Sequence, residues 1–134
     1  MKIILNDWNM VKMFFIVGLG SFLGGGSRYL VQQFFARQFP EPFPVGTLVV
    51  NIVGSLIIGI VFGLSERSNL LSNEMRIFLA TGICGGFTTF SSFSIENYAM
   101  LKDGQYFYIF CYVGLSLFIG FLATFTGIQL IKIF

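Results

Sequence analysis

Four long hydrophobic stretches divide the chain, and short polar segments separate them. The stretches cover about residues 13–35, 45–64, 77–100 and 107–131. Each holds about 20 residues or more, which at a rise of about 1.5 Å per residue lets a helix cross the hydrocarbon core of a bilayer. The pattern predicts an all-α membrane protein, in which residues 1–134 form a single domain of four transmembrane helices.

The polar segments predict the connections between these helices. Residues 39–44 (FPEPFP) contain all three prolines, which end one helix and stiffen the turn into the next. Residues 65–76 (SERSNLLSNEMR) are the most polar segment and predict a loop, and residues 101–105 (LKDGQ) predict a tight turn. Four helices joined in this way place both termini on the same side of the membrane.

Composition separates this chain from soluble proteins and from enzymes. Hydrophobic residues make up 55% of the chain and charged residues 10%, whereas a soluble domain carries about 25% charged residues. Histidine, the usual general base and the commonest metal ligand, is absent from the sequence. With no plausible pair of nucleophile and base either, we expect a multi-pass protein of the cell membrane that is not an enzyme.

Two of the predicted helices carry polar and small residues at every fourth position, which keeps them on related faces. Such residues allow close helix packing, and a row of hydroxyls can instead line an aqueous path. The amide of Asn51 must find a partner or face water near the middle of the membrane, which favours a functional role. The row in the second helix is Thr47, Asn51, Ser55, Gly59 and Gly63, and that in the fourth is Tyr112, Ser116, Gly120 and Thr124.

Two charged residues lie inside hydrophobic stretches. Arg28 follows Gly20 and Gly24 at intervals of four, and an arginine there needs carbonyl or carboxylate partners, a wet vestibule, or a route to the interface. We expect a structural or vestibule role for it. Glu96 is the acidic residue well inside the third stretch, where it can pair with a basic residue or cap backbone groups, and where proton coupling is the less favoured alternative.

The third stretch contains a segment that is unsuited to a continuous helix. Residues 82–93 read GICGGFTTFSSF, in which glycines weaken the helix and four hydroxyl side chains can bond to the backbone instead. A break leaves carbonyls and amides unpaired, which a bilayer tolerates only where protein or water satisfies them. Broken helices commonly place such groups around an ion. The segment therefore predicts a break at an ion site, with a kink used only for packing as the alternative.

Phe90 and Phe93 flank this predicted break on one face of the helix that resumes after it. A phenylalanine ring has a negative face and a positive edge. Two rings placed edge-on can therefore solvate a small anion without a fixed cation that would trap it.

The motifs that carry these features resemble the Fluc family of fluoride channels, also called CrcB. They are G-x-x-x-G-x-x-x-R-Y at 20–29, G-T-x-x-x-N-x-x-G-S at 46–55 and G-G-F-T-T-F-S-S-F at 85–93. The resemblance covers nearly the whole chain. It implies passive, fluoride-selective export through an antiparallel, dual-topology dimer with two pores, and a structural sodium ion at the dimer interface.

The resemblance also assigns roles to individual positions. Main-chain carbonyls of Gly85 and Thr88, from both subunits, would hold the sodium ion. Gly120 stands where a further hydroxyl is expected, while Ser21 and Ser92 replace a usual glycine and a usual threonine. The residues that the resemblance and the polar rows place on the fluoride pathway are Thr47, Asn51, Phe90, Ser91, Ser92, Phe93, Tyr112, Ser116 and Thr124.

The distribution of positive charge bears on how two such chains assemble. The side with the termini carries five basic residues (Lys2, Lys12, Arg67, Arg76 and Lys132), and the other side carries two (Arg37 and Lys102). By the positive-inside rule this favours cytoplasmic termini, whereas an antiparallel homodimer needs a bias near zero. We expect a homodimer, with a heterodimer of two oppositely oriented chains as the alternative.

Two other functions fit four short membrane helices. A small proton-coupled multidrug exporter needs a central carboxylate facing its substrate, and the first helix has none. A membrane assembly factor that transports nothing gives no reason for the break in the third helix. The sequence therefore favours the fluoride channel, with the exporter as the alternative.

Overall fold

The computed structural model describes residues 7–40, 42–67 and 70–133, and within these ranges every regular element is helical. Within the described ranges, four helical spans are long and apolar enough to cross a membrane. The first is α1 (Asp7–Gln38), the second α2 (Val45–Glu66) and the fourth α6 (Tyr106–Ile133). The third consists of α3 (Asn73–Ile77), the π-helix η1 (Phe78–Cys84), α4 (Gly85–Phe87) and α5 (Phe90–Lys102).

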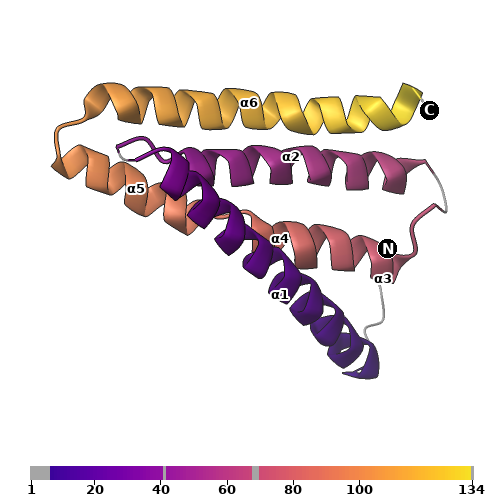
Figure 1. Cartoon of the computed structure of the whole chain (residues 1–134). Coiled ribbons are helices and arrows are strands. Elements are labelled where there is room, and N and C mark those ends of the chain that lie inside the picture. The colour runs from indigo at the N-terminus through magenta and orange to yellow at the C-terminus, as the bar shows by residue number, and fades with distance from the viewer. Residues whose placement is uncertain (1–6, 41, 68–69, 134) are drawn as a thin grey trace.

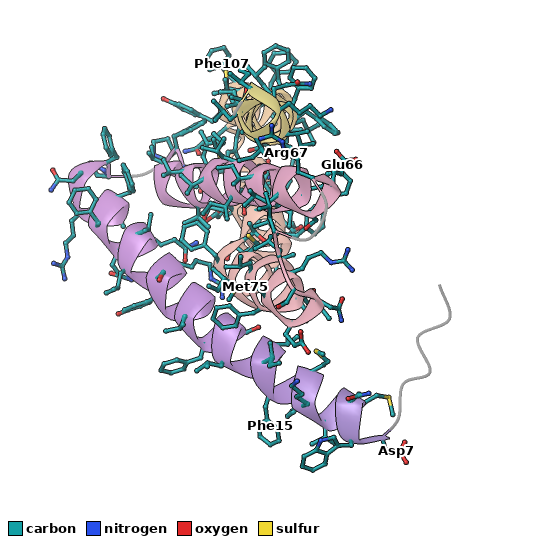
Figure 2. The ribbon with its side chains drawn as sticks, turned by 90° about the vertical axis from the view of Figure 1, so that its right-hand side faces the viewer. Asp7, Phe15, Glu66, Arg67, Met75 and Phe107 are labelled. Carbon is teal, nitrogen blue, oxygen red and sulfur yellow. The ribbon has the colours of Figure 1, made fainter. Side chains whose placement is uncertain are left out.

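The spans form a stack that α1 crosses at an angle. In Figure 1, α6 and α2 run side by side, the third span lies below α2, and α1 passes diagonally across the third span. Figure 2, turned by 90°, shows α6, α2 and α3 one above another, with Phe15 and Phe107 projecting away from the stack. Both of these rings are mostly exposed, as expected for side chains that face lipid.

The predicted break is present at Thr88 and Thr89, and we refer to these two residues as the break. Their backbones are extended, with φ/ψ of −77°/159° and −152°/116°, so the helical ladder stops after α4 and restarts at Phe90. The hydroxyl of Thr89 caps the new helix by accepting from the Ser92 N–H at 3.1 Å. The π-helical turns of η1, which α4 separates from the break, were not predicted by the glycine and hydroxyl pattern.

The predicted connections at 39–44 and 101–105 are present, although α5 continues through Leu101 and Lys102, and the prediction for residues 65–76 is only partly correct. The turn at 101–105 closes through Gly104, whose φ of 71° suits glycine, and the Gln105 N–H donates to the Met100 carbonyl at 2.9 Å. The segment 65–76 is not all loop, because α2 continues to Glu66 and α3 begins at Asn73. Ser72 makes this early start possible, since its hydroxyl accepts from the Met75 N–H at 3.1 Å. Lys2, which entered the charge count, lies outside the described residues.

Glycines bring α1 and the third span into backbone contact. A Cβ on Gly20 would lie 2.8 Å from the Gly82 Cα and from the Phe78 carbonyl oxygen, and one on Gly24 would press into the Ile83 carbonyl. The 20–24 spacing of the arginine motif is therefore used for packing. A similar contact joins α2 to α6, where a Cβ on Gly127 would lie 2.5 Å from the Leu56 carbonyl oxygen.

This packing predicts opposite effects for two glycines of α1. Gly24→Ala places a methyl group against the backbone of the third span, and we expect it to lower the free energy of unfolding by about 1–3 kcal/mol. A methyl group on Gly26 would meet nothing within 4 Å, so Gly26→Ala should be neutral or stabilise by up to about 1 kcal/mol. Thermal unfolding in detergent measures both, and equal melting temperatures for the two variants would contradict the packing.

Candidate functional site

Asn51 of α2 pairs with the backbone of the break in both directions. Its Oδ1 accepts from the Thr89 N–H at 2.8 Å, and its Nδ2 donates to the Thr89 carbonyl at 3.1 Å. A side-chain amide carries both a donor and an acceptor. Its oxygen replaces the helical acceptor that the Thr89 N–H loses when the ladder stops, and its N–H adds a second donor to the Thr89 carbonyl, which as N-cap accepts the first bond of α5. This paired contact is the partner that an amide at this depth requires.

The pairing with Asn51 has a consequence for the carbonyl of Gly85. In a continuous α-helix the Thr89 N–H would donate to the Gly85 carbonyl, four residues earlier. Because that N–H is bonded to Asn51, the Gly85 carbonyl loses its usual helical donor, and Gly85 itself is exposed. The Thr88 carbonyl accepts from Nη1 of Arg28 at 3.2 Å. Arg28 thus has a carbonyl partner at the break, and this carbonyl of Thr88 is one of the two that the family resemblance assigns to sodium.

Hydroxyl groups gather around Thr89, which is 6% exposed. Its Oγ1 lies 3.1 Å from the Ser92 Oγ and 3.3 Å from the Ser91 Oγ. The two predicted serines therefore meet at one point, at the start of α5. In the sequence, Thr89 is only one of four hydroxyl residues of 82–93 that can bond to the backbone. Its position at the centre of these contacts depends on the fold.

A second cluster, one turn along α2, surrounds Glu96. The Thr47 hydroxyl donates to Glu96 Oε1 at 2.6 Å, and the Tyr112 hydroxyl donates to Oε2 at 2.7 Å. We call these three residues the carboxylate cluster. Among the described residues, Glu96 is thus satisfied by two hydroxyls, rather than by a basic side chain or by the backbone.

The two phenylalanines after the break lie next to each other and next to the carboxylate cluster. The ring centroids of Phe90 and Phe93 are 5.8 Å apart, and those of Phe93 and Tyr112 are 5.0 Å apart. Phe93 is half-buried, whereas Phe90 is 78% exposed. The chain therefore presents one ring to its own interior and the other outward.

A cavity of about 450 Å³ lies beside the break, and we call it the break cavity. Residues of α2, the third span and α6 line it, and none of the lining side chains is charged. Asn51, Thr89, Phe93 and Ser116 all border it. Ser116 has a buried hydroxyl with no hydrogen-bond partner within the described chain. The cavity thus offers neutral hydroxyl and amide groups and two aromatic rings, whose edges are the part of a ring that can contact a small anion.

A second cavity, of about 470 Å³, lies toward the end of the molecule that holds the 101–105 turn, and we call it the end cavity. Thr47, Ser92 and Glu96 border it, together with Asp103 at the turn. Thr47 and Asn51 are four residues apart on α2, yet they border different cavities. Thr47 and Glu96 of the carboxylate cluster therefore border the end cavity, and the break borders the other. Tyr112 is fully buried behind them and borders neither cavity.

The row of polar residues on α6 was predicted to line the pathway as far as Thr124, but Thr124 borders neither cavity. The Thr124 hydroxyl donates to the Ser55 carbonyl at 3.1 Å, so it ties α6 to α2 and is not among the residues that line either cavity. Gly120, which interrupts the row, faces Ser55, whose Oγ is 3.7 Å from a Cβ placed at position 120. A hydroxyl from α2 therefore stands near the position where α6 lacks one.

Comparison with known proteins connects this geometry to one family. The sequence matches the profile of the family described as “CrcB-like protein, Camphor Resistance (CrcB)” over residues 15–128. This range includes the break, both cavities and the packing glycines. The chain belongs to the CrcB family.

Named relatives in the CrcB family cover almost all of this chain. The chain is 50% identical over 117 residues to a protein of Gloeothece citriformis, and the aligned region covers 87% of this chain and 94% of the relative. It is 43% identical over 122 residues to a protein of Flavobacterium psychrophilum, spanning 91% of this chain and 98% of the relative. Both relatives are named “Fluoride-specific ion channel FluC”. The family resemblance stated from the three motifs is confirmed.

Proposed function

We propose that this chain forms a passive, fluoride-specific channel of the cell membrane that lowers the cytoplasmic fluoride concentration. Membership of the CrcB family, with relatives named as fluoride-specific channels, is the observation that carries the proposal. The uncharged break cavity supports it, because fluoride is a small, strong hydrogen-bond acceptor whose bound water can be replaced by hydroxyl and amide donors. Export then needs no energy source beyond the fluoride gradient.

The residues around the two cavities form the proposed pathway. Asn51 and Ser116 offer donors at the break cavity, and Phe90 and Phe93 offer ring edges. Ser91 and Ser92 lie at the start of α5, and Ser92 borders the end cavity together with Thr47 and Glu96. Tyr112 bonds to Glu96 from the buried side of this cluster. Thr124 lies further along the same row of α6. Arg28, bonded to the Thr88 carbonyl, has a structural role at the break in this proposal.

A structural sodium ion fits the oxygen atoms at the break. Gly85 contributes a carbonyl without its usual helical donor, and the extended backbone of Thr88 turns a second carbonyl out of the ladder. The Thr88 carbonyl also accepts from Arg28, so one of its lone pairs would remain for the ion. Hard cations prefer oxygen ligands and take about six of them, so two carbonyls from one chain are too few. A second copy, antiparallel and related by a two-fold axis through the break, would contribute the matching pair and bring the number of carbonyl ligands to four of the about six that a hard cation takes. We therefore propose an antiparallel homodimer, and a heterodimer with a related chain is the alternative arrangement.

The proton-coupled exporter gains no support from the site. Such a protein needs a carboxylate that is free to meet substrate, and both oxygens of Glu96 accept hydrogen bonds from Thr47 and Tyr112. The two relatives described above are named as channels.

Fluoride efflux from proteoliposomes containing this one purified chain tests the proposal. A fluoride electrode should record rapid release, while a chloride electrode records retention under the same gradient. Release of both ions, or of chloride alone, would contradict fluoride specificity. If neither ion leaves, co-expression with a second homologous chain separates a heterodimer from an error in the function.

Removal of sodium tests the structural cation separately. Protein prepared with N-methylglucamine in place of sodium should melt at a lower temperature, because a ligand at a hundred times its dissociation constant stabilises by about 2.7 kcal/mol. Returning sodium should restore the melting temperature, and matched osmolarity of the organic salt should not. An unchanged melting curve after exhaustive removal would contradict a sodium site at the break.

A further inference from the structure

Gln32 of α1 contacts the carboxylate cluster from a third helix. Its Nε2 donates to the Thr47 Oγ1 at 3.0 Å, and it borders the end cavity. Gln32 belongs to none of the three family motifs, which cover residues 20–29, 46–55 and 85–93. The proposed function assigns it no role.

The chemistry of the Thr47 hydroxyl makes this contact directional. A hydroxyl has a single proton to donate and lone pairs with which it accepts. Because an amide N–H of Gln32 occupies the accepting side, the proton of Thr47 points to Glu96, and the 2.6 Å separation is typical of a hydroxyl bonded to a carboxylate. Thr47 is 2% exposed, so water is poorly placed to take over from either partner.

We infer that Gln32 is a positioning residue, which keeps the Thr47 hydroxyl turned toward Glu96 and so holds the carboxylate beside the fluoride pathway. The inference rests on the proposed function. A carboxylate next to an anion pathway repels fluoride unless donors spread its charge. With the Gln32 amide gone, Thr47 can rotate away, and Glu96 Oε1 then loses the donor that shields it.

Two substitutions at position 32 separate this role from the filling of space. Gln32→Met removes the donor at similar volume, and we expect fluoride efflux to fall about threefold to tenfold, the ratio that one buried hydrogen bond in a membrane protein is worth. Gln32→Glu keeps the shape but competes for the Thr47 proton and adds a second negative charge near Glu96 and Asp103. Its efflux should therefore fall below that of Gln32→Met. Leu30→Met is the control, because Leu30 of α1 is 67% exposed and borders neither cavity, and its efflux should match the wild type.

A double-mutant cycle asks whether Gln32 acts through Thr47. In a Thr47→Val background the hydroxyl is gone, so Gln32→Met should cause no further loss of efflux. Wild-type efflux in Gln32→Met, wild-type efflux in Gln32→Glu, or independent losses in the double variant would each overturn the inference. Elution as a single species in detergent confirms that each variant is folded.

The same cycle also works if the proposed function fails. Should the wild-type chain release no fluoride, the melting temperatures of the four proteins still report the coupling between Gln32 and Thr47. Non-additive melting temperatures would then support the contact and leave only the transported ion in question. Additive changes in melting temperature would reject the positioning role of Gln32, in addition to the channel function that the absent fluoride release had already rejected.

Discussion

Asn51→Leu is expected to abolish fluoride efflux and to destabilise the protein. The substitution leaves the Thr89 N–H and carbonyl without the two partners that Asn51 supplies at 2.8 and 3.1 Å. The Thr89 N–H is then unsatisfied, which costs about 1–3 kcal/mol, while the carbonyl of this N-cap residue keeps the first bond of α5 and loses one hydrogen bond worth about 0.5–1.5 kcal/mol. The free energy of unfolding should therefore fall by about 1.5–4.5 kcal/mol. The unpaired Thr89 N–H would also be free to bond to the Gly85 carbonyl, which would close the break and remove an oxygen from the proposed cation site.

Efflux and thermal unfolding, measured on the same purified sample, test this expectation. Ser65→Ala on the same helix is the matched control, because the Ser65 hydroxyl donates to the Val61 carbonyl one turn earlier on α2 itself. That variant should keep its efflux and nearly all of its stability. Near-normal efflux in Asn51→Leu would show that Asn51 neither lines the pathway nor maintains the break.

Phe93→Ile is expected to reduce fluoride efflux by at least about a hundredfold while the protein stays folded. Phe93 lies between Phe90 and Tyr112 and borders the break cavity, so it is placed to present a ring edge to an anion. Isoleucine fills part of the space but has no positive edge. A loss of about 3 kcal/mol of anion stabilisation corresponds to this ratio.

The control for Phe93 is a ring that faces outward. Phe118 of α6 is 73% exposed and borders neither cavity, so Phe118→Ile should keep wild-type efflux. Phe93→Ile should elute from a sizing column as the wild type does. Equal efflux in the two variants would show that the ring at position 93 is packing alone.

The expectations for Asn51 and Phe93 concern the same part of the structure, the break and the start of α5. Asn51 holds the backbone of the break open, and the ring of Phe93 follows four residues after the Thr89 that Asn51 holds. A helix that continued through residues 88–89 would place α5 differently and would move Phe93 away from Asn51. We therefore expect the Asn51 variant to affect both stability and efflux, and the Phe93 variant mainly efflux.

The sequence by itself determined the four spans, the break and the family. Length and hydropathy are properties of each stretch alone, and a bilayer accepts few structures other than helices, so these predictions needed no tertiary information. The glycines and hydroxyls of 82–93 predicted the break for the same local reason. The start of α3 inside a polar segment was missed, because the capping Ser72 was hidden among other polar residues.

Only the tertiary structure decided which polar groups meet. Thr47 and Asn51 are four residues apart, so the sequence predicts that they share one face of α2. In the packed structure, however, Asn51 bonds to the break and Thr47 bonds to Glu96. Gln32 joins Thr47 from a helix whose pattern gave no sign of it, because the crossing angle of α1 is set by the glycine contacts with η1 and α4. Hydrogen bonds between distant segments depend on how rigid helices cross, and a pattern along one helix contains no information about its neighbour.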